Sequence, residues 1–123
     1  MKALIVGFGH AGKAYATALK ATFHGVQIHV EDNNPSIEIP DNHVVFENNK
    51  ELTYDLAIVA TPPDSHYDVM RELFKKSNLV IVEKPIAISW SDHQKILQFA
   101  SENDGIYFSF HAVFGRELSF LPS

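Results

Sequence analysis

The stretch "GFGHAG" at residues 7–12 directly follows the short apolar run at residues 2–6. From Ala11 to Phe23, at the end of this stretch and after it, apolar residues recur at helical spacing. Glycines at the first, third and sixth positions of a strand-to-helix turn allow a tight turn, a close ligand approach and close helix packing. This feature predicts the first βα unit of a dinucleotide-binding domain.

Short apolar strands continue to alternate with amphipathic helices along the chain. Further strands are predicted at residues 26–30, 44–46, 55–60, 79–82 and 106–110. This alternation is typical of a doubly wound α/β fold, with a mainly parallel sheet of about six strands and helices on both faces. The link from Asp32 to Val44 is short for a crossover between parallel strands, so we expect a loop or a single helical turn there.

Two further helices are predicted from their start signals and apolar spacing. Asp64 or Ser65 can cap the first, whose apolar stripe is Val69, Met70, Leu73 and Phe74. The segment Ser89-Trp90-Ser91-Asp92 resembles a capping box and opens the second. The expected apolar face of that helix holds His93, Ile96, Leu97 and Ala100.

Composition excludes several classes of protein. The 123 residues suffice for one domain, and the net charge is −5. From Glu31 to Glu72 there are ten acidic residues but only two basic ones, Lys50 and Arg71, which argues against nucleic acid as a partner. No cysteine is present, which excludes disulfides and thiolate metal sites and fits a cytoplasmic protein. The histidines lack metal-ligand spacing, and the apolar run before Gly7 is too short for a signal peptide or a membrane span.

The predicted ends of the first two strands carry the residues expected at a dinucleotide. Gly7, Gly9 and Gly12 would let a pyrophosphate approach the amino terminus of the first helix. Asp32 lies twenty residues after Gly12, about where an acid holds the ribose hydroxyls, and Glu31 is the alternative if the register differs by one residue. No basic residue stands nearby to neutralise a 2′-phosphate, so NAD is favoured over NADP.

Two later strands end at the same predicted crevice. Thr61, Pro62 and Pro63 follow the fourth strand, although Pro63 could simply start the helix. His66 is either a surface histidine or close enough to reach the cofactor. The fifth strand ends at Glu83-Lys84-Pro85, which would stand near the redox end of a dinucleotide. The alternative there is an ion pair in a solvated turn.

The motifs "GFGHAGKAYATAL", "ATPPDSHYDVM" and "VIVEKPIAIS" occur in the order seen in the Gfo/Idh/MocA oxidoreductases. The chain resembles this family over residues 1 to about 110. The resemblance implies an NAD(P)-binding Rossmann domain that acts on a sugar, polyol or related carbinol. It places Phe8, His10 and Ala11 at the pyrophosphate, and Asp32 with Asn33 at the ribose. It also places Thr61, Pro62, Pro63 and His66 along the middle of the cofactor, and Glu83 and Lys84 at the nicotinamide, with Lys84 orienting the reacting hydroxyl.

The resemblance also implies a second domain, which carries the general acid/base and much of the substrate site and through which the family forms homo-oligomers. We therefore expect residues 1–110 to form the cofactor domain and residues 111–123 to begin the crossover to an absent substrate domain. The apolar tail "FSFHAVFGRELSFLPS" favours such a truncation. The alternative is a complete small NAD-binding module that acts as a sensor or a partner subunit without catalysis.

Overall fold

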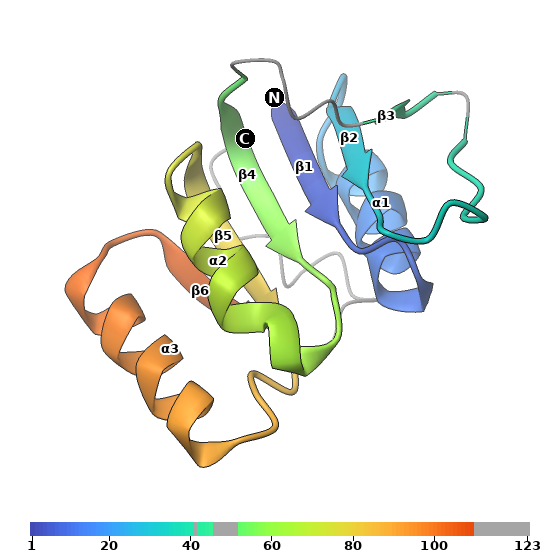
Figure 1. The fold of residues 1–123 in the computed structure, drawn as a ribbon. Coiled ribbons are helices and arrows are strands. Elements are labelled where there is room, and N and C mark those ends of the chain that lie inside the picture. Colours follow the sequence, from blue (N-terminus) through green and yellow to red (C-terminus); the bar gives the residue numbers. More distant parts are fainter. Residues whose placement is uncertain (41, 46–51, 110–123) are drawn as a thin grey trace.

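The computed structural model describes residues 1–40, 42–45 and 52–109. Six strands form one parallel sheet in the order β3-β2-β1-β4-β5-β6 (Figure 1). The strands are β1 Lys2–Val6, β2 Gln27–Glu31, β3 Val44–Val45, β4 Tyr54–Val59, β5 Ser77–Glu83 and β6 Ile106–Ser109. The helices are α1 His10–Thr22, the 3₁₀ turn η1 Pro63–Ser65, α2 His66–Phe74 and α3 Trp90–Glu102. The predicted doubly wound α/β fold is confirmed.

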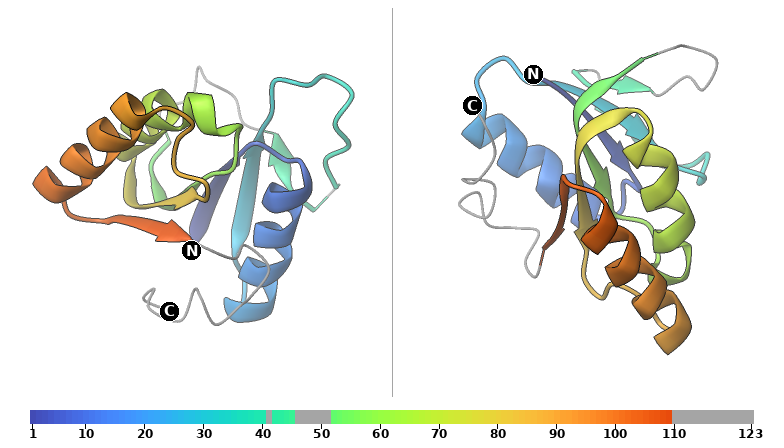
Figure 2. Two further views of the ribbon diagram at one scale, coloured as in Figure 1. Left: turned by 90° about the horizontal axis from the view of Figure 1, so that it is seen from below. Right: turned by 90° about the vertical axis from the view of Figure 1, so that its left-hand side faces the viewer.

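Helices cover both faces of the sheet, with α1 on one side and α2 and α3 on the other (Figure 2). On the first face, Tyr15 and Leu19 of α1 pack against Ile5 of β1 and Ile28 of β2. On the second face, Met70 and Leu73 of α2 and Ile96 of α3 join a separate core cluster. Two buried layers on one sheet explain why the strands are apolar on both sides.

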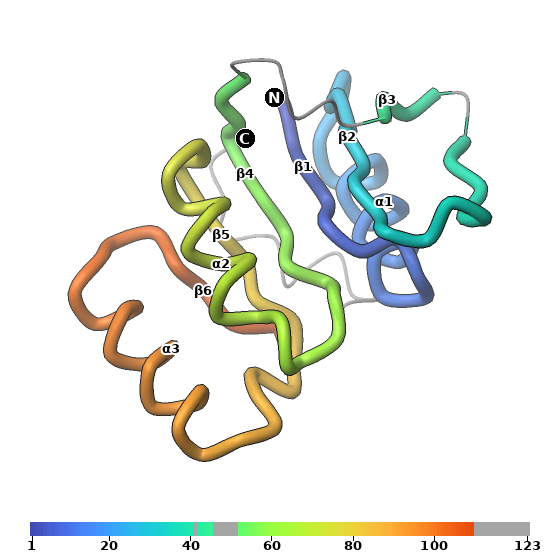
Figure 3. Tube along the Cα trace, in the orientation of Figure 1, coloured from blue at the N-terminus to red at the C-terminus, as the bar shows by residue number. Residues whose placement is uncertain are grey.

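The connections out of β1 and β4 lie next to each other at the carboxyl ends of the strands (Figure 3). The chain leaves β1 toward β2 on one side, whereas β4 continues toward β5 on the other. The strand order therefore reverses between β1 and β4, which is where open parallel sheets bind ligands. Gly7 N donates to Glu31 O at 2.8 Å and Ala60 N to Val6 O at 2.8 Å, so the three strand ends are joined at this point.

Most predicted elements agree with the structure to within two residues at each end. Residues 32–43 contain no helix in their described part, as expected for so short a link. Ser89 caps α3 by accepting a hydrogen bond from Asp92 N at 3.1 Å. Phe46, Phe110 and the segment 111–123, on which parts of the predictions fall, lie outside the described residues.

Two local expectations about the helices are wrong. Leu97 was expected on the buried face of α3 but is 43% exposed, and Phe99 instead packs edge-on against Phe74 at 5.3 Å between ring centroids. Ser65 directly precedes α2 without capping it through its side chain. Its hydroxyl instead donates to Thr61 Oγ1 at 2.7 Å, which binds the start of the helix to the end of β4. The contact of Phe99 with Phe74 joins distant segments, which a local pattern does not contain, whereas the Ser65 hydroxyl meets a competing acceptor only four residues away.

A buried polar pair links β2 to β4. The Tyr54 hydroxyl lies 3.1 Å from Nδ1 of His29, and the two rings meet edge to face. Burial, and then the nearby charge of Glu31, raise the pKa of Tyr54 above its ordinary value. The folded chain therefore holds the phenolic proton more tightly than the unfolded chain does.

This pKa shift predicts how stability changes at alkaline pH. The contribution of Tyr54 to the free energy of unfolding is complete below about pH 10 and is lost as the pH rises through the folded-state pKa. We expect Tyr54→Phe to remove part of that alkaline loss in urea denaturation between about pH 9 and pH 11. Tyr107→Phe, at a site that is 42% exposed, is the control. The same alkaline loss in Tyr54→Phe and the native chain would contradict the prediction.

Candidate functional site: the crevice at the strand ends

The three glycines of "GFGHAG" meet different requirements. Gly7 has φ +95°, and a Cβ on it would lie 2.6 Å from Ala60 O. A Cβ on Gly12 would lie 2.0 Å from Gly7 O, so this glycine lets α1 pack against the end of β1. Gly9, which precedes α1, is exposed, and a Cβ on it would meet nothing within 4 Å. Gly7 and Gly12 are thus required by the fold, whereas Gly9 borders open space.

Asp32 is bonded to the glycine loop. Its Oδ2 accepts a hydrogen bond from Phe8 N at 2.6 Å, and its Oδ1 accepts one from Asn34 N at 2.7 Å. A carboxylate has about four lone-pair sites, so two acceptor positions remain for other donors. Asp32, which is predicted to bind the ribose, thus lies directly beside the loop predicted to hold the pyrophosphate.

A cavity of about 910 Å³ opens at this point. Of the residues predicted at the cofactor, it brings together Gly7, Gly9, Asp32, Asn33, Thr61 and Pro62. Its volume is within the range of small-molecule and cofactor sites. Gly9, at the amino terminus of α1, has no side-chain cap among the described residues. A helix terminus of this kind favours an anion such as a pyrophosphate, so the residues present fit a dinucleotide.

One wall of the cavity is acidic, which the sequence analysis missed. Its lining includes Glu31, Asp32, then Asp64 of η1, Asp68 and Glu72 of α2, and Lys76, which lies between α2 and β5. The last four are spaced by four residues, a signal for one side of a helix that could have identified this wall. The hydrogen bond from Lys75 to Glu72, at 3.0 Å, and the charge of Lys75 lower the pKa of the Glu72 carboxyl. Among the described residues that line the cavity, Lys76 is the only basic one.

Other predicted cofactor residues do not line the cavity. The Phe8 side chain is 2% exposed and belongs to the core cluster on the α1 face, so only its backbone amide faces Asp32. His10 and Ala11 form the first residues of α1, and Gly12 is buried in the same turn. Pro63 is the first residue of η1, in agreement with the alternative that it starts the helix.

His66 is buried, with 1% of its surface exposed, so the alternative of a surface histidine is wrong. Its Nε2 lies 2.7 Å from Thr61 O and its Nδ1 lies 2.9 Å from Ile86 O. The imidazole therefore contacts the backbone of the segments that follow β4 and β5. It is not among the residues that line the cavity.

Glu83 ends β5 and is followed by Lys84, whose peptide bond to Pro85 is cis. Both residues are partly buried. Lys84 N donates to Ser109 O at 3.1 Å, so the backbone here is tied to β6. Neither side chain lines the 910 Å³ cavity, although both stand at the same edge of the sheet as Thr61.

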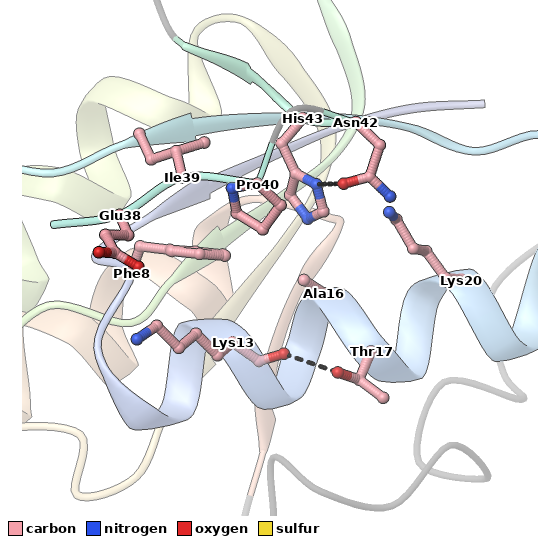
Figure 4. A pocket seen from close by; sticks show the side chains of 10 residues that line it. All are labelled: Phe8, Lys13, Ala16, Thr17, Lys20, Glu38, Ile39, Pro40, Asn42 and His43. Carbon is pink, nitrogen blue, oxygen red and sulfur yellow. Dashed lines mark hydrogen bonds between the residues drawn. The ribbon is translucent and has the colours of Figure 1, made fainter.

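A second cavity, of about 660 Å³, lies between α1 and the link that leads from β2 to β3 (Figure 4). Lys13 and Lys20 border it from α1, and His43 borders it from the link. Burial, and then the charge of Lys20, lower the pKa of His43. Phe8 is the only predicted cofactor residue that lines this space. This second cavity lies where a longer connection from β2 to β3 would place a helix beside α1.

Within residues 1–40, 42–45 and 52–109, no group of three or more His, Asp or Glu side chains could hold a metal ion. No helix in these ranges is long and apolar enough to cross a membrane.

Comparison with known proteins assigns the fold to a family. The family model described as "Oxidoreductase family, NAD-binding Rossmann fold" matches residues 1–111. No curated protein matches the chain. Solved structures do match, at identities that support likeness of fold alone.

Three of these structures illustrate the likeness. The WlbA dehydrogenase of Bordetella pertussis, in complex with NADH and UDP-GlcNAcA, matches with TM-score 0.67 and 22% identity over 89% of this chain and 34% of that one. Biliverdin reductase of Synechocystis sp. PCC 6803, with biliverdin and NADP⁺, matches with TM-score 0.66 and 18% identity over 96% and 39%. Apo scyllo-inositol dehydrogenase of Lactobacillus casei matches with TM-score 0.65 and 18% identity over 89% and 35%.

The chain thus spans little more than a third of the length of these three proteins. The six-stranded parallel sheet with helices on both faces agrees with the Rossmann fold that describes the family model. The chain belongs to the Gfo/Idh/MocA oxidoreductase family, as an NAD-binding Rossmann domain.

Proposed function

We propose that the chain is the cofactor-binding part of an NAD-dependent oxidoreductase that oxidises or reduces a carbinol in a sugar, polyol or related compound. The observation that carries this proposal is the bond from Phe8 N to Asp32 Oδ2, which places the acid against the glycine loop at the mouth of the cavity. Nicotinamide supplies hydride transfer when it is bound. The residues of this chain would bind and orient it.

Each part of the cavity suits one part of the dinucleotide. The open side of Gly9 and the amino terminus of α1 would take the pyrophosphate. The free acceptor positions of Asp32 would take the ribose hydroxyls, with Asn33 alongside. Thr61 and Pro62 would line the middle of the cofactor. The end of β5 would bring Glu83 and Lys84 to the nicotinamide and the substrate.

The charge of the cavity favours NAD over NADP. Asp32 and Glu31 stand together at the end of β2, and Asp64, Asp68 and Glu72 line the same space. A 2′-phosphate would add negative charge beside these carboxylates, with Lys76 as the only basic lining residue. The known complexes of similar structures include both NADH and NADP⁺, so this preference is a property proposed for this chain.

The proposal extends to the whole protein. A second domain would supply the general acid/base and the substrate specificity and would form the contacts of a homo-oligomer. Without that domain the chain would bind NADH and turn over little substrate. We propose a cytoplasmic location, in line with the lack of cysteines.

Titration with both cofactors tests this function. We expect the 123-residue chain to bind NADH more tightly than NADPH, measured by calorimetry. Asp32→Ala should weaken NADH binding by about 1–3 kcal/mol, the cost of leaving polar partners unsatisfied, and should reduce the preference. Asp104→Ala, at an exposed site in the turn before β6, is the matched control. NADPH binding as tight as NADH binding would refute the role given to Asp32.

A further inference from the structure

His66 stands between two backbone segments that no strand ladder joins. The pairing of β4 with β5 ends at Val59 and Val82. Thr61 and Ile86 lie beyond these residues, yet the carbonyl oxygen of each meets one nitrogen of the same imidazole, at 2.7 Å and 2.9 Å. The ring thus continues the connection between the two strand ends past the point where the sheet stops.

The surroundings of the ring distinguish it from a histidine that only fills space. It is 1% exposed, and both of its nitrogens face carbonyl oxygens, which can only accept. A ring with one N–H donates to one of these carbonyls, and a ring with a proton on each nitrogen donates to both. A phenylalanine would fill the same volume but could satisfy neither carbonyl. A buried carbonyl that loses its donor is costly, so the polar atoms of His66 contribute something that its volume does not.

The two segments that His66 joins are the ones that carry the predicted chemistry. Thr61 lines the 910 Å³ cavity, and Lys84 lies two residues before Ile86. Lys84 N is itself held by Ser109 O of β6 at 3.1 Å. The segment after β5 is therefore bonded to β6 on one side and, through His66, to the segment after β4 on the other.

We propose that His66 is a positioning residue, a clasp that sets the distance and orientation between Thr61 at the cofactor cavity and Lys84 at the reacting end. Its effect on a cofactor rests on the function proposed above. The clasp itself rests on the two contacts between the ring nitrogens and the carbonyl oxygens of Thr61 and Ile86, and it does not depend on a ligand. His66 acts through backbone atoms and does not touch the cofactor.

Two substitutions can remove the contacts one at a time. The amide nitrogen of asparagine can occupy the place of Nδ1 and donate to Ile86 O, whereas that of glutamine can occupy the place of Nε2 and donate to Thr61 O. Phenylalanine removes both ring nitrogens and keeps an aromatic ring. His24→Phe, at an exposed site before β2, is the control for a histidine substitution outside the crevice.

Amide hydrogen exchange of the full chain reports on each segment separately. The Ser65 amide donates to Pro62 O at 3.0 Å after β4, and the Lys84 amide donates to Ser109 O after β5. The Gln27 amide, which donates to Met1 O at 2.9 Å at the opposite edge, corrects for changes in global stability. After this correction we expect His66→Phe to speed exchange at both Ser65 and Lys84 by about tenfold or more, the scale of a lost buried hydrogen bond.

The asparagine and glutamine variants should separate the two segments. His66→Asn is expected to speed exchange at Ser65 alone, and His66→Gln at Lys84 alone. Unchanged exchange at both amides in His66→Phe would overturn the clasp. So would an equal increase at both amides in the asparagine and glutamine variants, because the ring would then support the core as a whole. If His66→Phe fails to fold, the asparagine and glutamine variants decide the question by themselves.

A fluorescence titration with NADH adds the link to function. If the native chain binds NADH, His66→Phe and His66→Asn should weaken binding by about tenfold, and His66→Gln should retain most of it, because Thr61 lines the cavity. Native affinity in His66→Phe would refute the link to the cofactor. A native chain that binds no NADH would instead refute the proposed function, whereas the exchange measurements would still test the clasp.

Discussion

Gly12→Ala is expected to destabilise the fold by at least about 3 kcal/mol, the upper part of the range for overpacked interiors, and to abolish NADH binding. The added Cβ would lie 2.0 Å from Gly7 O. Because the atom it meets belongs to the backbone, no flexible side chain can move aside to relieve the contact. To relieve the contact, α1 must separate from the end of β1. Urea denaturation would measure the loss of stability, and calorimetry the loss of binding.

Gly9→Ala is the matched comparison within the same motif. A Cβ on Gly9 meets nothing within 4 Å, and its φ of −78° suits alanine, so the free energy of unfolding should stay close to native. NADH binding should nevertheless weaken, because the methyl group would occupy the space proposed for the pyrophosphate. Loss of stability in both variants, or in neither, would show that the division of roles between the glycines is incorrect.

Lys84→Ala is expected to lower kcat by about 10²–10³ in an active enzyme that contains this domain, with little change in NADH affinity. At the end of β5, its ammonium group can donate to the substrate oxygen and stabilise the negative charge that develops as the hydroxyl loses its proton. Because that contact strengthens in the transition state, the loss should appear in kcat and in kcat/KM alike. Steady-state kinetics with saturating NAD would measure both.

The alternative for Lys84 is a turn lysine that pairs with Glu83, which at an exposed site would be worth less than about 1 kcal/mol. Lys75→Ala tests the general effect of removing a lysine, since Lys75 is exposed and pairs with Glu72 at 3.0 Å. A loss of less than about fivefold in kcat for Lys84→Ala, with native cofactor affinity, would favour the turn lysine. Equal losses in the two variants would also exclude a specific role for Lys84.

The sheet and its crevice could be predicted from the sequence because their causes are local. Short apolar strands next to amphipathic helices can bury their surfaces only in a layered parallel sheet, and such a sheet binds ligands at the carboxyl ends of its strands. The sequence assigns Gly7 to a tight turn and Gly12 to close packing. In the structure, a Cβ on Gly7 would meet the carbonyl of Ala60, and a Cβ on Gly12 would meet the carbonyl of Gly7. The short link between Asp32 and Val44 likewise left too few residues for a crossover helix.

The side chains at the crevice depended on contacts between distant segments. Phe8 follows the first glycine of the motif, but its side chain is buried in the core on the α1 face. Only its backbone amide donates a hydrogen bond to Asp32. His66 was assigned to the surface or to the cofactor, and the structure instead places it between Thr61 O and Ile86 O. The row of Asp64, Asp68 and Glu72 lines the cavity only because α2 packs over β4 and β5.

The sequence by itself determined the strand-and-helix alternation, the glycine turn and the acid that follows β2, since spacing along the chain specifies each of them. Tertiary structure decided which groups face the cavity and which hold it together. Asp32 and His66 each have one hydrogen-bond partner that is twenty or more residues away along the chain, Phe8 for Asp32 and Ile86 for His66. Local propensity carries no information about such partners, because a buried polar group bonds to whatever donor or acceptor the completed packing brings within reach.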